Sequence, residues 1–122
     1  MPYRRGMGAM GLPGDFSSAS PFVRAALVRE NAVADGDEAS GVSQFFHILG
    51  SVEHVRGCVR LDDGKYEITA YTSCINLNRG IYYYTTYENR AISAVDLHKC
   101  NLESRGLCRF CLVIKQKITR QN

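Results

Sequence analysis

Polar and apolar side chains alternate over residues 65–97, the longest stretch of the chain with one consistent period. Successive side chains of an extended chain point to opposite faces, so this period predicts strands. In the first run, one face carries Tyr66, Ile68, Ala70, Thr72 and Cys74. Three consecutive tyrosines, residues 82–84, begin a second run, and residues 91–96 alternate again after it. The stretch is therefore expected to hold three strands.

Two turn signals separate these runs. Residues 76–80 include Asn and Gly, which accept positive φ at the least cost, and residues 88–90 form a weaker signal. The pattern thus predicts a three-stranded antiparallel meander over 65–97. Bulky side chains occur on both faces of this sheet, so we expect both faces to be covered.

Helical periodicity precedes the meander. Ser17, Ser18 and Ser20 are candidate N-caps, and Pro21 suits the first helical position after Ser20. The stripe expected to face a core over 17–34 comprises Phe22, Val23, Ala26, Leu27 and Val33. A clearer stripe over 42–54 comprises Val42, Phe45, Phe46, Leu49 and Val52. Two helices are predicted, and His47 points away from the second stripe.

The other segments complete a layered arrangement. Residues 1–16 form a Gly-rich approach segment, residues 35–41 an acidic linker, and residues 107–118 are apolar enough for a last strand. Two helices followed by strands predict an α/β (α+β) fold in which the helices cover one sheet face. The chain has 122 residues, 45% hydrophobic and 22% charged, which predicts a single domain or part of one.

Charge and cysteine content exclude several classes of protein. The net charge of +3 comes from scattered basic residues, which argues against a nucleic-acid partner. No apolar run approaches the roughly 18 residues that cross a bilayer, so no membrane partner is expected. The N-terminus has no apolar leader, and five irregularly spaced cysteines are atypical of a secreted disulfide framework. Reduced thiols in a cytoplasm are the expectation.

The best candidate metal ligands are His98, Cys100, Cys108 and Cys111, because imidazole and thiolate bind structural zinc. However, they include only one close Cys-x-x-Cys pair. On a strand over 107–118, the two cysteines of that pair would point to opposite faces. A redox role for the pair is disfavoured because an apolar run follows it, where redox motifs open a helix. Small buried or edge thiols are the expectation.

Two further features of the sequence do not indicate a functional site. The Gly-rich run lacks the Gly-Lys-Ser/Thr sequence of a phosphate-binding loop. His47 has no Ser or Cys nucleophile placed beside it by the sequence, so it is expected to be an exposed or edge histidine. We therefore predict neither a metal nor a cofactor.

Three blocks of the chain resemble one known family. They are residues 71–97, YTSCINLNRGIYYYTTYENRAISAVDL, residues 5–24, RGMGAMGLPGDFSSASPFVR, and residues 42–52, VSQFFHILGSV. In this order and spacing they resemble the choloylglycine hydrolases, the bacterial bile salt hydrolase and penicillin V acylase family of N-terminal-nucleophile (Ntn) amidases. The resemblance covers only the C-terminal segment of such an enzyme, and it implies part of an αββα sandwich.

The resemblance also implies a mechanism. In this family an N-terminal cysteine attacks the amide carbonyl, its own α-amino group acts as base, and Asn and Asp side chains position the reacting groups. The present sequence begins with Met1-Pro2, and its first cysteine is Cys58. The resemblance therefore implies that no catalytic nucleophile lies within these residues and that the chain is inactive alone.

One catalytic position of the family does fall within the chain. It is the arginine of an Ala-Ser-Arg-Phe pattern, where this sequence reads Ala19-Ser20-Pro21-Phe22. Arg24, three residues further on, matches the family's second, structural basic position. A helical offset of three keeps Arg24 on roughly the side of Pro21, so it is a weak substitute. No family catalytic residue is thus expected to be intact.

The leading hypothesis is a C-terminal segment of a choloylglycine hydrolase-like amidase. The resemblance implies conjugated bile acids or penicillin V as substrates and homo-oligomers for intact relatives, and the sequence does not choose between the substrates. The alternative hypothesis is a non-catalytic binding or assembly module that uses the aromatic residues of 82–87.

Overall fold

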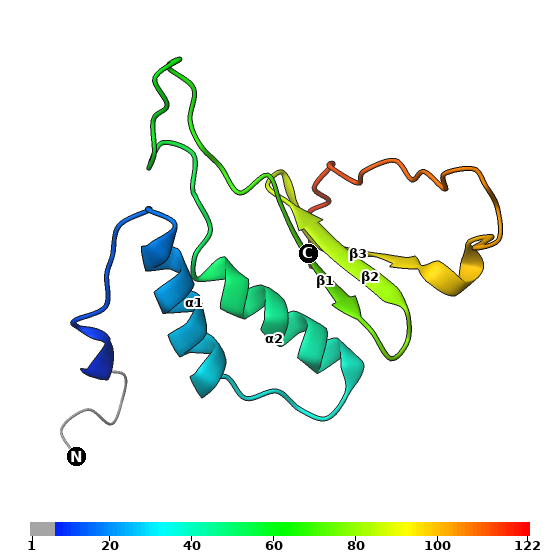
Figure 1. Ribbon diagram of the computed structural model, residues 1–122, viewed down its shortest axis with the longest axis horizontal. Coiled ribbons are helices and arrows are strands. Elements are labelled where there is room, and N and C mark those ends of the chain that lie inside the picture. The colour runs from blue at the N-terminus through cyan, green and yellow to red at the C-terminus, as the bar shows by residue number, and fades with distance from the viewer. Residues whose placement is uncertain (1–6) are drawn as a thin grey trace. The chain divides into compact units, whose positions relative to one another are not determined.

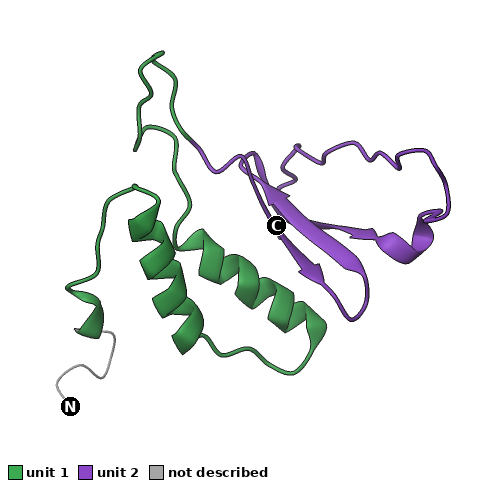
Figure 2. Ribbon diagram, viewed as in Figure 1, with its two compact units in different colours: residues 1–67 green, residues 68–122 purple. Residues whose placement is uncertain are grey.

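A computed structural model describes residues 7–122, which belong to two compact units (Figure 2). The helical unit is Met1–Glu67, described from residue 7 onward, and the sheet unit is Ile68–Asn122. The helical unit holds a short 3-10 turn, Met7–Ala9, and two helices, α1 (Ala19–Asn31) and α2 (Glu38–Gly50), which lie side by side (Figure 1). Both predicted helices are present with shifted ends.

Helix α2 begins four residues earlier than predicted because the acidic linker supplies its cap. The carboxylate of Asp37 accepts a hydrogen bond from the backbone N–H of Ser40 at 3.0 Å. This bond satisfies one of the donors that a first turn leaves unpaired. Residues 38–41, expected in the linker, therefore form the first turn, and the helix ends at Gly50 rather than at residue 54.

Helix α1 begins at Ala19, so Ser20 and Pro21 are its second and third residues. The predicted N-cap role of Ser20 is wrong, since its hydroxyl donates to a side chain of the preceding loop. Pro21 still lies in the first turn, where a missing N–H costs no intrahelical bond. The helix ends at Asn31, three residues before the predicted end.

The expected core face of α1 is largely uncovered within the described residues. Phe22 is 74% exposed and Val33 is 84% exposed, and Ser20 is the one buried residue of α1. The prediction of a buried stripe is therefore wrong for this chain by itself. Two helices side by side bury only the edge along which they meet, and an amphipathic stripe needs a further layer to cover it.

Residues 65–70 are not part of the first strand, although the alternating pattern places them there. Of these residues, Ala70 bonds toward the sheet, because its carbonyl accepts the N–H of Tyr87 at 3.0 Å. Tyr66 forms an isolated bridge with Arg60, and the N–H of Glu67 donates to the carbonyl of Val59 at 3.0 Å. A turn through Gly64, whose φ is +83°, brings these residues together. This local pairing involves residues 65–67, and the strand of the sheet begins at Tyr71.

The predicted antiparallel meander is confirmed over residues 71–96. Its strands β1 (Tyr71–Asn76), β2 (Ile81–Thr86) and β3 (Asn89–Asp96) pair in the order β1-β2-β3. Tyr83 pairs with Cys74 on one side and with Ala94 on the other. The turn after β1 needs Gly80, whose φ is +61°. With two helices and this sheet, the α/β class is confirmed.

The predicted last strand over 107–118 does not form. The segment is instead fixed by single hydrogen bonds that involve side chains. The N–H of Val113 donates to the hydroxyl of Tyr84 at 3.1 Å, and Asn89 Nδ2 donates to the Val113 carbonyl at 3.2 Å. The amide of Arg90 donates to Gln116 Oε1 at 2.8 Å. Bonds of this kind place a chain beside a sheet without building the backbone ladder that defines a strand.

Candidate functional site

The loop before α1 is organised around the carboxylate of Asp15. One oxygen accepts the N–H of Ser17 at 2.7 Å, and the other accepts the hydroxyl of Ser20 at 2.9 Å. The two serine hydroxyls are themselves 3.4 Å apart. Hydrogen bonds from Ser17 first, then from Ser20, and the charge of Arg24 together hold the pKa of Asp15 below its ordinary value.

Arg24 closes the same loop from the second turn of α1. Its Nη1 donates to the carbonyl of Pro13 at 2.8 Å and to the carbonyl of Asp15 at 2.9 Å. These bonds tie the Gly-rich approach to the helix and place a positive charge beside Asp15. The contacts fit the structural role that the resemblance assigned to Arg24. Pro21, on the preceding turn, brings neither a charge nor a donor to this loop.

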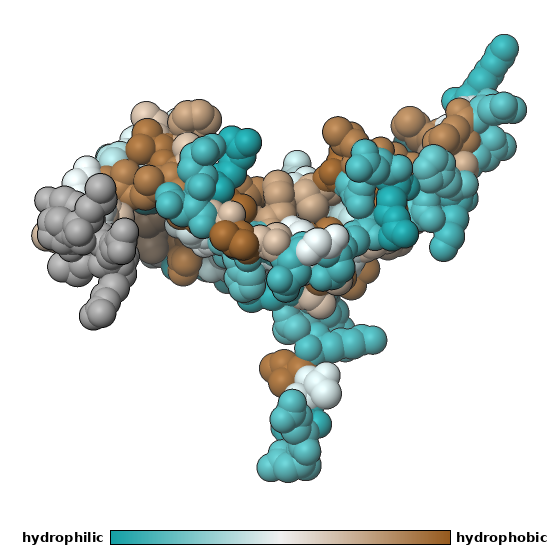
Figure 3. Space-filling view, turned by 90° about the horizontal axis from the view of Figure 1, so that it is seen from below, coloured by the Kyte–Doolittle hydropathy of each residue, from teal (hydrophilic) through white to brown (hydrophobic). Residues whose placement is uncertain are grey.

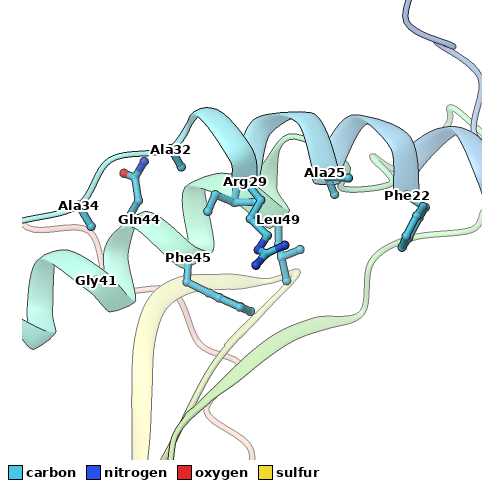
Figure 4. Close-up of a pocket in the computed structure, with 11 residues that line it drawn as sticks. Phe22, Ala25, Arg29, Ala32, Ala34, Gly41, Gln44, Phe45 and Leu49 are labelled. Carbon is cyan, nitrogen blue, oxygen red and sulfur yellow. The ribbon is translucent and has the colours of Figure 1, made fainter.

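Each unit has an apolar cavity among its described residues. The cavity of the helical unit has a volume of about 540 Å³ and lies between α1 and α2. Figure 4 shows Arg29 reaching from α1 toward Phe45 and Leu49 of α2. The cavity of the sheet unit has a volume of about 570 Å³. It is lined by Tyr82 and Tyr84 of β2 and by residues of 97–122, the segment after β3, which we call the C-terminal segment. Apolar cavities of this size suit hydrophobic groups.

The aromatic run of β2 is divided between the two faces of the sheet. Tyr82 and Tyr84 share one face, with ring centroids 6.3 Å apart, and Tyr83 points to the other. Tyr84 is only 8% exposed, and its hydroxyl is bound by the C-terminal segment. Only part of the run from 82 to 87 is therefore open to a partner.

The candidate zinc ligands do not come together. Within residues 7–122, no three His, Cys, Asp or Glu side chains are placed to hold a metal ion. Cys100 and Cys108 do lie together, because both line the cavity of the sheet unit. A hydrogen bond with the Cys108 thiol raises the pKa of Cys100. The His98 ring lies against Gly80, where an added Cβ would be 2.8 Å from Nε2. Cys111 is exposed, and the opposite-face argument for it no longer applies without a strand.

Other predicted positions are found as follows. His47 is exposed on α2, as expected. Cys74 is half-buried in β1, and burial raises the pKa of its thiol, which lowers the fraction present as nucleophilic thiolate.

Sequence reasoning missed Asp15 and the pairing of Cys100 with Cys108. The Asp-x-Ser spacing at 15–17 could have signalled a side chain that caps its own turn, whereas no local pattern announces the cysteine pair.

Comparison with known proteins places this loop, helix pair and meander in one class. A family model described as linear amide C-N hydrolases, choloylglycine hydrolase family, matches residues 1–110. A bile salt hydrolase/transferase from Lactiplantibacillus plantarum is 50% identical over 110 residues, which are 90% of this chain and 34% of that protein. The fold and sequence thus match part of the class that this model describes. The chain belongs to the choloylglycine hydrolase family.

Solved structures agree with this assignment. Conjugated bile acid hydrolase from Clostridium perfringens superposes with a TM-score of 0.84 at 42% identity, over 97% of this chain and 36% of the other. Penicillin V acylase from Agrobacterium tumefaciens superposes with a TM-score of 0.62 at 17% identity over 80% of this chain and 31% of the other, and it shares the fold. The chain spans about a third of the length of the relatives it matches. Among residues 7–122, no helix is long and apolar enough to cross a membrane.

Proposed function

We propose that this chain is the C-terminal part of an amide hydrolase that acts on conjugated bile acids. The observation that carries the proposal is the 50% identity to a bile salt hydrolase/transferase, against 17% identity to a penicillin V acylase of the same fold. The proposed substrate class is therefore that of the relatives with the higher sequence identity. The reaction is hydrolysis of the amide between the bile acid and its amino acid.

The role proposed for residues 1–122 is to build the wall of the active site and not to supply the nucleophile. In support, burial raises the pKa of Cys74, and contact with Cys108 raises that of Cys100, so both thiols are less ionised than an active nucleophile requires. Residues 1–122 alone should therefore release no glycine or taurine from conjugated bile acids. Product formation that persists after thiol alkylation and repeated purification would contradict this.

Pro21 is the residue on which activity of the assembled enzyme should depend. The resemblance puts an arginine at this position, where a guanidinium would favour the nucleophilic thiolate and orient it. Arg24 already donates hydrogen bonds to the carbonyls of Pro13 and Asp15, so we propose that it does not replace that arginine.

A hybrid enzyme tests this assignment. The segment of the Lactiplantibacillus plantarum relative that precedes its matched region would be fused ahead of Met1. The hybrid should fold but hydrolyse conjugated bile acids slowly, and Pro21→Arg should raise kcat/KM at least about tenfold, or roughly 1.4 kcal/mol of barrier.

A matched control is Asn31→Arg, which adds the same charge to α1 at an exposed position off the apolar stripe. It should leave the rate unchanged. Full activity of the Pro21 hybrid, with no gain from Pro21→Arg, would show that another group serves and that the assignment of this position is wrong.

A further inference from the structure

The segment after β3 reverses direction and brings two distant cysteines together. The N–H of Ser104 donates to the carbonyl of Asn101 at 3.2 Å, and the N–H of Gly106 donates to the Ser104 hydroxyl at 3.1 Å. This turn returns Cys108 to Cys100, and both thiols line the same cavity of the sheet unit. The Cys100 thiol also donates to the carbonyl of Asp96 at 3.8 Å, which directs its sulfur toward the end of β3.

The sequence alone would pair Cys108 with Cys111, because they form the one Cys-x-x-Cys motif among the five cysteines. The structure gives Cys108 a different neighbour, eight residues earlier in the chain. We propose that Cys100 and Cys108 are the site of a reversible disulfide that closes residues 100–108 into a ring and fastens the C-terminal segment over the sheet. This inference does not depend on the proposed function.

The oxidant in this proposal is a small disulfide such as oxidised glutathione. Cys108 is exposed, so its thiolate attacks one glutathione sulfur first and releases one glutathione thiolate. The thiolate of half-buried Cys100 then attacks the Cys108 sulfur and releases the second glutathione. Each protein thiol loses one proton and one electron, and one oxidised glutathione becomes two reduced glutathiones. The raised pKa of Cys100 makes it the poorer first nucleophile and fits the second role.

Closing this ring has a mechanical consequence for the C-terminal segment. Leu112 and Phe110, just after Cys108, line the cavity together with Tyr82 and Tyr84. The segment is held to the sheet at Val113 by hydrogen bonds to Tyr84 and Asn89. A covalent link at Cys108 shortens the free chain that leads to these contacts, so the segment should detach less often when oxidised.

The test uses the full chain in buffers with fixed ratios of reduced to oxidised glutathione. Samples are alkylated in acid, digested and mapped by mass spectrometry. Free thiols should fall from the five of the reduced chain by the loss of one pair, and the cross-linked peptide should join Cys100 to Cys108. Cys111→Ser should leave this product unchanged. Cys100→Ser should instead accumulate glutathione on Cys108.

A second readout is tryptic cleavage after Arg109 and Lys115. Oxidation should slow it roughly tenfold in the unsubstituted chain and in Cys111→Ser, since a closed ring restricts local opening. Cleavage in Cys108→Ser should not respond to the redox buffer. A product that joins Cys108 to Cys111, or glutathione adducts that persist on all exposed cysteines without a cross-link, would overturn the proposal.

Discussion

At the scale of single residues, Asp15 shows how a short polar side chain can organise a Gly-rich loop. It accepts hydrogen bonds from Ser17 and Ser20 and lies beside Arg24, which binds two carbonyls of the same loop. Each interaction favours the charged carboxylate, so the folded pKa lies below the ordinary value of 3.8. A group with a lowered folded pKa stabilises the fold above its unfolded pKa, and this contribution is lost as the pH falls through the folded value.

Asp15→Asn should therefore lower the thermal midpoint of the hybrid by a few degrees at pH 7. The difference from the parent should shrink as the pH falls below about 4, because protonation removes the same charge from the parent. Midpoints measured by circular dichroism from pH 7 to pH 3 check this. Asp62→Asn, at an exposed position of the same unit, is the control and should show no such convergence. A difference that stays constant with pH would mean that shape and not charge matters at Asp15.

Gly80 is the residue that allows the turn between β1 and β2. Its φ of +61° is a left-handed conformation, and an added Cβ would lie 2.8 Å from Nε2 of His98. Gly80→Ala should lower stability by about 1 kcal/mol from the backbone alone. Because His98 is exposed, its ring can move aside, so adding His98→Ala should recover little of the loss. Chemical denaturation of the hybrid measures both, and Gly36→Ala, which meets no neighbour within 4 Å, should be nearly neutral.

At the scale of elements, local chemistry decided which predictions succeeded. The meander could be predicted because Asn and Gly residues fix the turn at 76–80 and the alternation fixes the faces. The start of the first strand could not, because residues 65–67 find a closer partner at 59–61 through the turn at Gly64. The prediction of the last strand was wrong for a related reason. An apolar run such as 107–118 does not encode which backbone edge it will meet, and side chains of Tyr84 and Asn89 anchor it instead.

The candidate site was predictable only in part for the same reason. The sequence resemblance aligns Pro21 and Arg24 with two positions of the family pattern. It does not reveal that Arg24 spans Pro13 and Asp15, since a loop carries no period from which contacts can be worked out. The approach of Cys108 to Cys100 is likewise a product of the turn through 101–107 and leaves no periodic signal.

Helix α2 offers a test of element boundaries. Asp37 caps its first turn through the N–H of Ser40, and the residues that follow were expected in a linker. Asp37→Ala should cost about 1 kcal/mol and unwind the first turn, because that donor then has no side-chain partner. Hydrogen exchange at the amides of 38–41 in the hybrid should speed up. Asp35→Ala keeps its backbone bond to Ser40 Oγ and should leave exchange unchanged. Equal effects of both substitutions would point to charge near the helix end and not to the cap.

At the scale of the whole molecule, the described residues bury almost no hydrophobic side chain. Among the described residues, Tyr84 is the one buried hydrophobic side chain. Brown, hydrophobic residues accordingly stand at the surface beside polar ones in Figure 3. The matched relatives are about three times as long, and we infer that in a longer family member further layers cover these faces.

This inference makes the effect of one substitution depend on context. Phe22 is 74% exposed on α1 and borders the cavity of the helical unit. In residues 1–122 alone, Phe22→Ala should cost little stability, because an exposed ring makes few contacts. It should lower binding of a hydrophobic dye and slow the aggregation expected of uncovered apolar faces and strand edges.

In the hybrid, the same substitution should have the opposite consequence. A covered Phe22 would be a core residue, and its truncation to Ala should destabilise by roughly 3–5 kcal/mol. Denaturant midpoints, dye fluorescence and sedimentation of both proteins, with and without the substitution, make the comparison. A monomeric 1–122 that unfolds in one sharp, reversible transition, with the same cost of Phe22→Ala in both proteins, would show that the chain covers its own core and needs no further layer.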